Sequence, residues 1–272
     1  MTDQNKKRGF FGKILDLPND DPKKTIIVAF LLCLVCSVLV SASAVMFKPL
    51  QKANKATDIR KNILAVTGLL NEEADVNKLF EQFEIKLVDL STGDYSDIDP
   101  ASFDRRKAAG DPNQSIALSG EQDIANISRR ANLAKIYLLK VDGEISQVVL
   151  PIHGYGLWST LYGFVSLEAD FNTIGGLQFY SHAETPGLGG EVDNPKWRKQ
   201  WQGKKAFNDS GELKIEVIRG HVSFQTTDAE HKIDGLSGAT LTSRGVSNLV
   251  NFWLGDNGFG PYLKKMSAEA EK

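Results

Sequence analysis

Residues 134–152 read AKIYLLKVDGEISQVVLPI, and this stretch predicts the centre of a β-sheet. Asp142 and Gly143 divide it into two apolar segments. Both residue types tolerate the positive φ angles of a two-residue turn, so the pair predicts a tight hairpin. Outward from the hairpin, three more segments have strand character: STLYGFVSLEA (159–169), LQFYSHA (177–183) and LKIEVIRG (213–220).

Helices are expected before, between and after these strands. Apolar residues recur at spacings of three and four within residues 51–70, and Gly68 provides a stop. Further helices are expected over residues 76–83, 120–134, 195–202 and 241–254. Residues 91–115 are rich in Ser, Asp, Gly, Pro and Asn and predict a surface excursion. The fold class is therefore α+β, with a mostly antiparallel sheet and flanking helices.

Residues 25–47 form an uncharged run, TIIVAFLLCLVCSVLVSASAVMF. As a helix it would be about 35 Å long, enough to cross a hydrocarbon core of about 30 Å. A cleaved signal peptide is the alternative, because Ala42-Ser43-Ala44 resembles a cleavage site. The length of the run favours a retained anchor. The predicted organisation is an N-terminal cytoplasmic arm (1–24), a transmembrane helix (25–47) and a soluble domain (48–272).

Basic residues near the two ends of this run are almost balanced, so they do not fix its orientation. A long C-terminal domain behind a first apolar segment can be translocated largely regardless of charge. We therefore expect residues 48–272 outside the cytoplasm.

Composition excludes several classes of function. A net charge of −2 without basic clusters argues against nucleic acid as a partner. The two cysteines, Cys33 and Cys36, both lie in the apolar run, so the soluble part has no disulfide framework. They pack either as small apolar residues or, with a partner protein, as iron–sulfur ligands. The four histidines lack metal-ligand spacing, and no metal site is expected.

The segment Asp234-Gly-Leu-Ser-Gly-Ala-Thr-Leu-Thr-Ser-Arg244 leads into the last predicted helix. Free N–H groups at a helix start favour a phosphate, and Arg244 follows Thr240 by four residues on the same face. The alternative is a plain helix cap, for which Ser and Thr are favoured. No lysine follows the glycines, which excludes a P-loop. No histidine follows Ser237, which excludes a serine hydrolase of the usual order.

This segment resembles the recognition sequence of the transferases that join FMN phosphate to a threonine hydroxyl, and the matching threonine is Thr240. Residues 181–189, SHAETPGLG, resemble the second signature of the same FMN-binding domain family. Within it, residues 151–163, PIHGYGLWSTLYG, are most similar to the C subunits of the sodium-translocating NADH:quinone reductases. The G subunit of the Rnf complex is similar but usually shorter, and it lacks the Leu-Trp-Ser-Thr sequence.

The resemblance implies FMN esterified to Thr240, with a set of further cofactor-binding residues: Asp234, Ser237, Gly238, Ala239, Arg244, Glu184, Thr185, Gly187, Leu188 and Trp158. For some of these a structural role is the alternative. Trp158 is equally a core residue, and Glu184 is alternatively a surface carboxylate. His182, in the same signature but outside this set, faces either the core or solvent.

The resemblance also implies an electron carrier of a bacterial inner membrane with its domain in the periplasm and no catalytic residue of its own. Its partners would be the membrane subunits B, D and E of the reductase, its NADH-oxidising F subunit indirectly, and a flavin transferase for maturation. The alternatives are an Rnf-type or free-standing carrier, or a non-redox anchored binding domain.

Overall fold

The computed structural model describes residues 18–19, 21–71 and 75–270. Most of the predicted cytoplasmic arm (1–24) lies outside these residues. The chain divides into two compact units, Met1–Ala56 and Thr57–Lys272. The predicted α+β class is confirmed.

A single long helix, α2 (Pro22–Val66), contains the apolar run and most of the helix predicted over residues 51–70. By length and composition it is suited to crossing a membrane. It ends in a Schellman motif, in which Leu69 N–H donates to Leu64 C=O (3.0 Å) and Gly68 N–H to Ala65 C=O (3.2 Å). Gly68 has the positive φ of 75° that this motif requires, so the predicted stop is confirmed.

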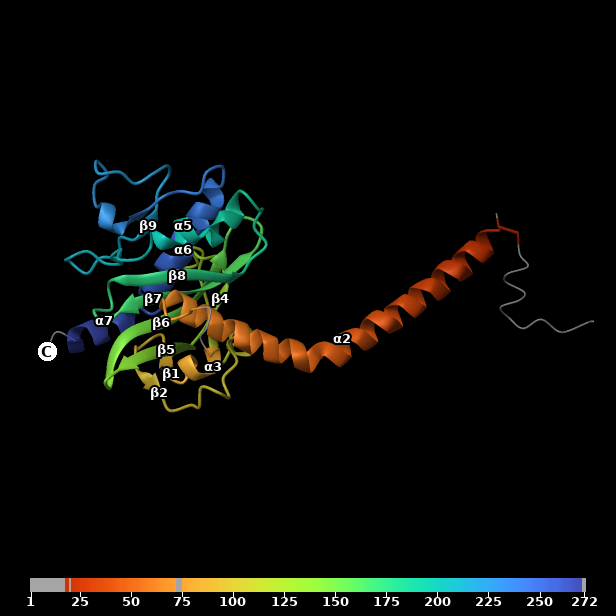
Figure 1. Ribbon diagram of the computed structural model, residues 1–272, viewed down its shortest axis with the longest axis horizontal. Coiled ribbons are helices and arrows are strands. Elements are labelled where there is room, and N and C mark those ends of the chain that lie inside the picture. The colour runs from red at the N-terminus through yellow and green to blue at the C-terminus, as the bar shows by residue number, and fades with distance from the viewer. Residues whose placement is uncertain (1–17, 20, 72–74, 271–272) are drawn as a thin grey trace, which may run out of the picture. The chain divides into compact units, whose positions relative to one another are not determined.

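The second unit is built on a six-stranded sheet of order β2-β1-β5-β6-β7-β8, in which every neighbouring pair is antiparallel (Figure 1). Asp142 (φ 53°) and Gly143 (φ 89°) form the predicted turn between β5 and β6. The strands are β1 (Phe83–Asp89), β2 (Tyr95–Ser96), β5 (Leu133–Val141), β6 (Glu144–Tyr155), β7 (Thr160–Glu168) and β8 (Ile174–Ser181).

Shorter elements surround the sheet, and α6 runs along it against β6. They are α3 (Val76–Phe80), α4 (Arg105–Gly110), β3 (Ser115–Ala117), β4 (Arg129–Ala131), η1 (Gly189–Asp193), α5 (Pro195–Lys199), β9 (Glu216–Val217), η2 (Ala229–His231), β10 (Lys232–Ile233), α6 (Thr240–Leu254) and α7 (Gly260–Ala270).

Both faces of the sheet are covered, because successive residues of a strand point to opposite sides. On one face Val148 and Leu150 pack in a core that includes the apolar side of α6. On the other face Val149 packs with Ile63 and Leu64 from the end of α2. The sheet therefore holds α6 firmly in place.

The helix predicted over residues 120–134 is wrong. The Asp123 carboxylate accepts hydrogen bonds from the N–H groups of Ile127 and Ser128, each at 2.7 Å. Asn126 and Ser128 have positive φ angles, which a right-handed helix does not allow. The segment is a loop that continues into β4.

The strand predicted over residues 213–220 is much shorter than expected. Glu216 and Val217 (β9) pair in parallel with β10, and Leu213 forms an isolated antiparallel bridge with Phe207. The Ser247 hydroxyl of α6 accepts from Val217 N–H at 2.7 Å. A side chain of the helix thus takes a backbone N–H group that could otherwise pair with a further strand.

Candidate functional site at the start of α6

The segment before α6 ends in a turn without a side-chain cap. Ala239 is the N-cap residue, and its side chain makes no capping hydrogen bond. Ser243 supports the turn from within the helix: its hydroxyl accepts from Leu236 N–H (2.9 Å) and donates to Ala239 C=O (3.1 Å). The interpretation of Ser237 and Thr240 as plain cap residues is therefore wrong.

Thr240 and Thr242 have opposite environments. Thr240, the first residue of α6, is exposed, and no other group of the described chain hydrogen-bonds its hydroxyl. Thr242 is fully buried, and its hydroxyl donates to Glu184 Oε2 at 2.8 Å. Of these two hydroxyls, that of Thr240 is the accessible one.

Glu184 links three segments behind Thr242. Its Oε1 atom accepts from the N–H groups of Leu157 (3.1 Å), Trp158 (3.0 Å) and Ser159 (3.2 Å). Burial raises the pKa of the Glu184 carboxyl, but the hydrogen bonds from the Thr242 hydroxyl and the three amides outweigh it and leave this pKa below its usual range. Glu184 is only 5% exposed, so it is not a surface carboxylate.

The loop after β8 approaches α6 closely. Gly189 lies so near that a Cβ there would be 2.6 Å from Thr242 Oγ1. The loop is shaped by Thr185, whose carbonyl accepts from Leu188 N–H (3.1 Å) and Gly190 N–H (2.9 Å). Gly187 completes the turn with a φ of 76°. The exposed Thr185 and Leu188 are thereby brought beside the turn before α6.

Large apolar side chains are exposed around this turn. Trp158 is 67% exposed, Leu241 53% and Leu188 43%. Leu188 reaches Gly238, where a Cβ would be 2.9 Å from Leu188 Cδ2. The alternative of a core tryptophan at position 158 is wrong, and a partly apolar surface borders the Thr240 turn.

His182 supports the same loop. Its Nδ1 atom accepts from Glu184 N–H (3.2 Å), and its Nε2–H donates to Asp193 Oδ2 (2.8 Å). The ring therefore carries its proton on Nε2 and joins two parts of the loop.

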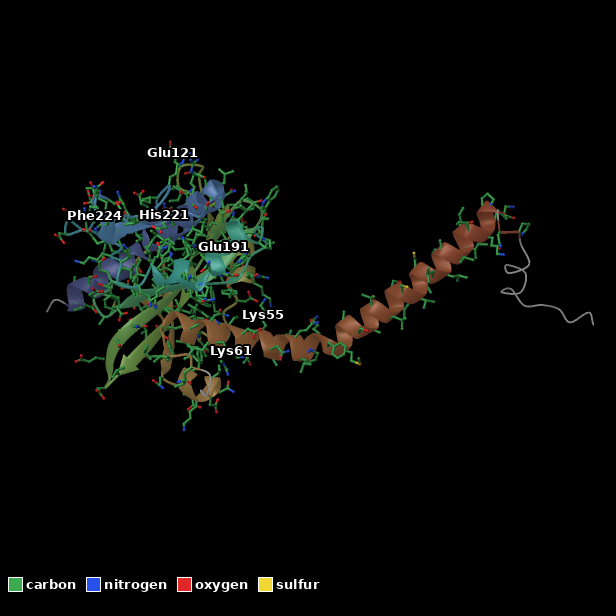
Figure 2. All side chains as sticks on the ribbon, turned by 45° about the horizontal axis from the view of Figure 1, so that its top comes forward. Lys55, Lys61, Glu121, Glu191, His221 and Phe224 are labelled. Carbon is green, nitrogen blue, oxygen red and sulfur yellow. The ribbon has the colours of Figure 1, made fainter. Side chains whose placement is uncertain are left out.

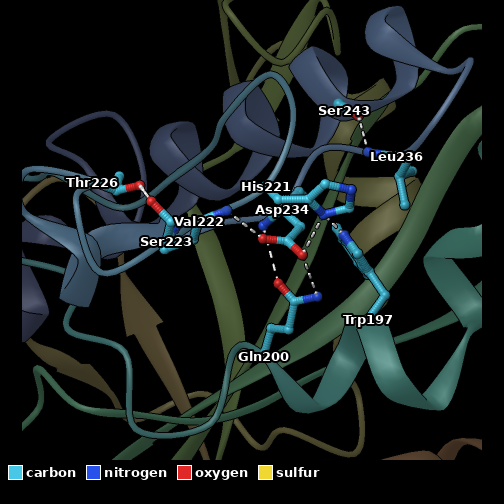
Figure 3. Close-up of polar contacts among 9 residues, drawn as sticks. All are labelled: Trp197, Gln200, His221, Val222, Ser223, Thr226, Asp234, Leu236 and Ser243. Atoms are coloured by element: carbon cyan, nitrogen blue, oxygen red, sulfur yellow. Dashed lines mark hydrogen bonds and ion pairs between the residues drawn. The ribbon is translucent and has the colours of Figure 1, made fainter.

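Asp234 fixes the approach to α6 (Figure 3). Its carboxylate accepts from Val222 N–H (2.7 Å), His221 Nδ1 (3.0 Å) and Gln200 Nε2 (3.2 Å). Burial raises the pKa of this carboxyl, but the hydrogen bonds, that of His221 foremost, outweigh it and hold the pKa below its usual value. These contacts give Asp234 a positioning role.

The loop held by Asp234 continues onto the surface. The His221 side chain is 85% exposed and Phe224 is 96% exposed, and both lie at the surface of the domain (Figure 2).

A cavity of about 440 Å³ lies between α6 and the segment that begins at β9, and Thr240 is one of its lining residues. Thr240, Arg244 and Asn248 line it from α6, and Arg219 lines it from the segment after β9. Among the described residues no carboxylate forms an ion pair with Arg219 or Arg244. Arg219 is not among the residues expected from the sequence, because no motif marks it and only the fold brings it beside α6.

No group of three or more His, Cys, Asp or Glu side chains in the described ranges is arranged to hold a metal ion. Cys33 and Cys36 are both exposed on α2.

Comparison with known proteins places this site in a family. A model described as FMN-binding domain matches residues 156–255, which span the Trp158 loop, the Glu184 loop and α6. The C subunit of the Na(+)-translocating NADH-quinone reductase of Yersinia pestis is 49% identical over 93% of this chain and 96% of its own length. That of Pseudomonas aeruginosa is 48% identical over 89% and 95%.

Two solved structures are similar in fold. The crystal structure of Shewanella oneidensis NqrC has a TM-score of 0.73 and 36% identity, covering 79% of this chain and 99% of that one. The C subunit from Parabacteroides distasonis has a TM-score of 0.61 and 28% identity, covering 81% and 96%. The chain therefore belongs to the NqrC family, the C subunits of the Na+-translocating NADH-quinone reductases, an oxidoreductase complex.

Proposed function

We propose that this chain carries FMN esterified through its phosphate to the Thr240 hydroxyl and serves as an electron-carrying subunit of a sodium-pumping NADH:quinone reductase. The observation that carries the proposal is the exposed, unbonded hydroxyl at the first position of α6. When bound, FMN supplies the redox chemistry, and the polypeptide supplies position and environment.

The residues around Thr240 fit both ends of this cofactor. Arg219 and Arg244 line one side and lack carboxylate partners within the described chain, so they are free to pair with a phosphate. Trp158, Leu188 and Leu241 present apolar surface for a flavin ring. Two turns border this site. The loop after β8 contains Thr185 and Gly187, and the turn before α6 contains Ser237, Gly238 and Ala239.

The further parts of the proposal concern the assembly. α2 anchors the chain in the inner membrane, the domain lies in the periplasm, and the partners are the membrane subunits B, D and E, with the F subunit more distant. A separate flavin transferase attaches the cofactor. Support comes from the names of the relatives and from the apolar run in α2. Protease added to spheroplasts should digest the domain, and protection would reverse the orientation.

The decisive experiment compares two hydroxyls two residues apart. The full chain is co-expressed with a flavin transferase, and the denatured band is examined under ultraviolet light and by intact mass. Thr240→Val should give a dark band without added mass. Thr242→Val should remain fluorescent, although it loses the bond to Glu184. A fluorescent Thr240→Val band with a dark Thr242→Val band would reassign the attachment site.

A further inference from the structure

A second cavity lies at the opposite end of α6. It has a volume of about 440 Å³ and is lined by Trp253 of α6, His153 of β6, Tyr162 of β7, and Arg105, Arg106 and Arg129. Trp253 follows Thr240 by thirteen residues, which corresponds to about 20 Å along a helix. The cavity is therefore separate from the site at Thr240.

Three guanidinium groups line this cavity without a carboxylate. Within the described residues none of Arg105, Arg106 and Arg129 forms an ion pair, whereas Lys86 and Lys140 both pair with Glu84. The Arg129 guanidinium donates to Ser115, a neutral partner. Positive charge gathered in a partly enclosed cavity attracts anions.

Arg105 and Arg106 both contact an aromatic ring of the sheet. Arg105 and Arg106 lie over the Tyr162 ring, with their Cζ atoms 5.6 and 5.4 Å from its centroid. Arg105 Nη1 lies 2.5 Å from His153 Nδ1. Because a guanidinium only donates, His153 Nδ1 must accept, which leaves the ring neutral with its proton on Nε2.

His153 is kept neutral by its surroundings. The Tyr162 ring stacks on the His153 ring with the two centroids 5.7 Å apart, and the Trp253 ring packs against it at 4.9 Å. Burial and the positive charges of Arg105 and Arg106 lower the pKa of His153 well below its usual value. An anion bound beside these arginines would offset their charge and raise this pKa.

Apart from the polar residues Asn126 and Thr160, the rest of the lining is apolar and includes Leu90, Ile127, Leu133 and Ala134. A volume of a few hundred Å³, an apolar wall and a few fixed polar groups are typical of small-molecule sites. We propose that this cavity binds a small organic anion, a carboxylate or phosphate monoester on a compact apolar body, through Arg105 and Arg106. This proposal is independent of the flavin at Thr240.

The test follows the ring signals of His153 by NMR in the full chain in detergent micelles. Only four histidines are present, so histidine-selective labelling gives few signals, and His153→Asn assigns the relevant one. The probes are phenyl phosphate, benzoate and inorganic phosphate, each compared with sodium chloride at equal ionic strength. Phenyl phosphate should shift the His153 signals saturably and raise its pKa, and it should bind more tightly than inorganic phosphate.

Arg105→Gln and Arg106→Gln should weaken phenyl phosphate binding about tenfold or more, since each removes a charge-assisted contact. Arg106 is exposed, so its variant should fold even if the Arg105 variant does not. Lys107→Gln is the matched control: Lys107 is exposed on the same helix and does not line the cavity, so binding should change less than about twofold. The absence of any saturable shift overturns the proposal. Equal binding by Arg106→Gln and the unaltered chain, or an equal effect of sodium chloride, also overturns it.

Discussion

The two sides of the first turn of α6 differ sharply. On the open side, Thr240 and Arg244 face a cavity, and Leu241 is exposed. On the closed side, Thr242 is fully buried, and its hydroxyl is hydrogen-bonded to Glu184. The Thr240 hydroxyl is therefore exposed on a turn whose neighbouring residues Thr242 and Ser243 are fixed by hydrogen bonds.

Glu184 is central to this difference, because it binds the closed side without contributing a group to the open one. Its carboxylate joins Thr242 to the amides of residues 157–159. The first turn of α6 is therefore tied by hydrogen bonds to the loops at residues 157–159 and 184.

The largest effect on stability is expected for Glu184→Ala. Removing the carboxylate leaves three partly buried N–H groups and the buried Thr242 hydroxyl without their acceptor, which should cost about 3 kcal/mol. Urea unfolding measures the loss. Glu184→Gln is the matched control, because its amide oxygen can still accept the three N–H bonds and its NH2 group can donate to Thr242. If both variants lose stability equally, the negative charge rather than the hydrogen bonds holds the closed side.

A smaller effect is expected for Gly238→Ala. The φ of 71° disfavours any residue with a Cβ, at a cost of about 1 kcal/mol. Gly187→Ala has a similar φ of 76° but no neighbour within 4 Å, so it measures the backbone strain alone. The two variants should unfold at similar urea concentrations. Only Gly238→Ala should displace Leu188 and alter the fluorescence of the attached flavin, and identical flavin spectra would remove Leu188 from the ring site.

Arg244→Gln tests the open side. An exposed guanidinium pairing with phosphate contributes about 0.2–1 kcal/mol, so covalent flavin incorporation by the transferase should slow by a few-fold at most. The initial rate of band fluorescence measures this effect. Lys199→Gln removes an exposed charge of α5 and should leave the rate unchanged. A complete block by Arg244→Gln would mean that the transferase itself recognises Arg244.

Acid should loosen the closed side by a small amount. The pKa values of Glu184 and Asp234 are lowered in the folded chain, so their contribution to stability is complete above their ordinary pKa values of about 4. This contribution to stability is lost as the pH falls through the lowered pKa values that the two carboxyl groups have in the folded chain. Urea midpoints measured from about pH 7 to about pH 3 should fall less steeply in Glu184→Gln than in the unaltered chain. Parallel profiles would show that Glu184 does not contribute.

Much of the fold could be predicted because its signals are local. The Asp142-Gly143 turn, the alternation in β5 and β6, and the apolar run in α2 depend on neighbouring residues only. The helix predicted over residues 120–134 failed because Asp123 binds backbone groups that a helix would use itself. Local composition did not reveal that competition.

The site could be predicted in part. The spacing of helical residues places Arg244 on the same side of α6 as Thr240 and turns Thr242 about 200° away from Thr240. The open and closed sides of the first turn therefore follow from the sequence once the helix is known. The partner of Thr242 does not follow, because Glu184 lies 58 positions earlier in the chain. Arg219 and the Arg105–His153 pair likewise depend on packing between distant segments.

The sequence by itself determined the central hairpin, the apolar run in α2 and the threonine that the flavin motif indicates. Only the tertiary structure decided that the Thr240 hydroxyl is exposed while Thr242 is sealed by Glu184, and that arginines gather at both ends of α6. The physical reason is that turn and helix preferences act over a few residues. Burial, hydrogen-bond partners and charge neighbours, in contrast, are set by which distant segments the sheet brings together.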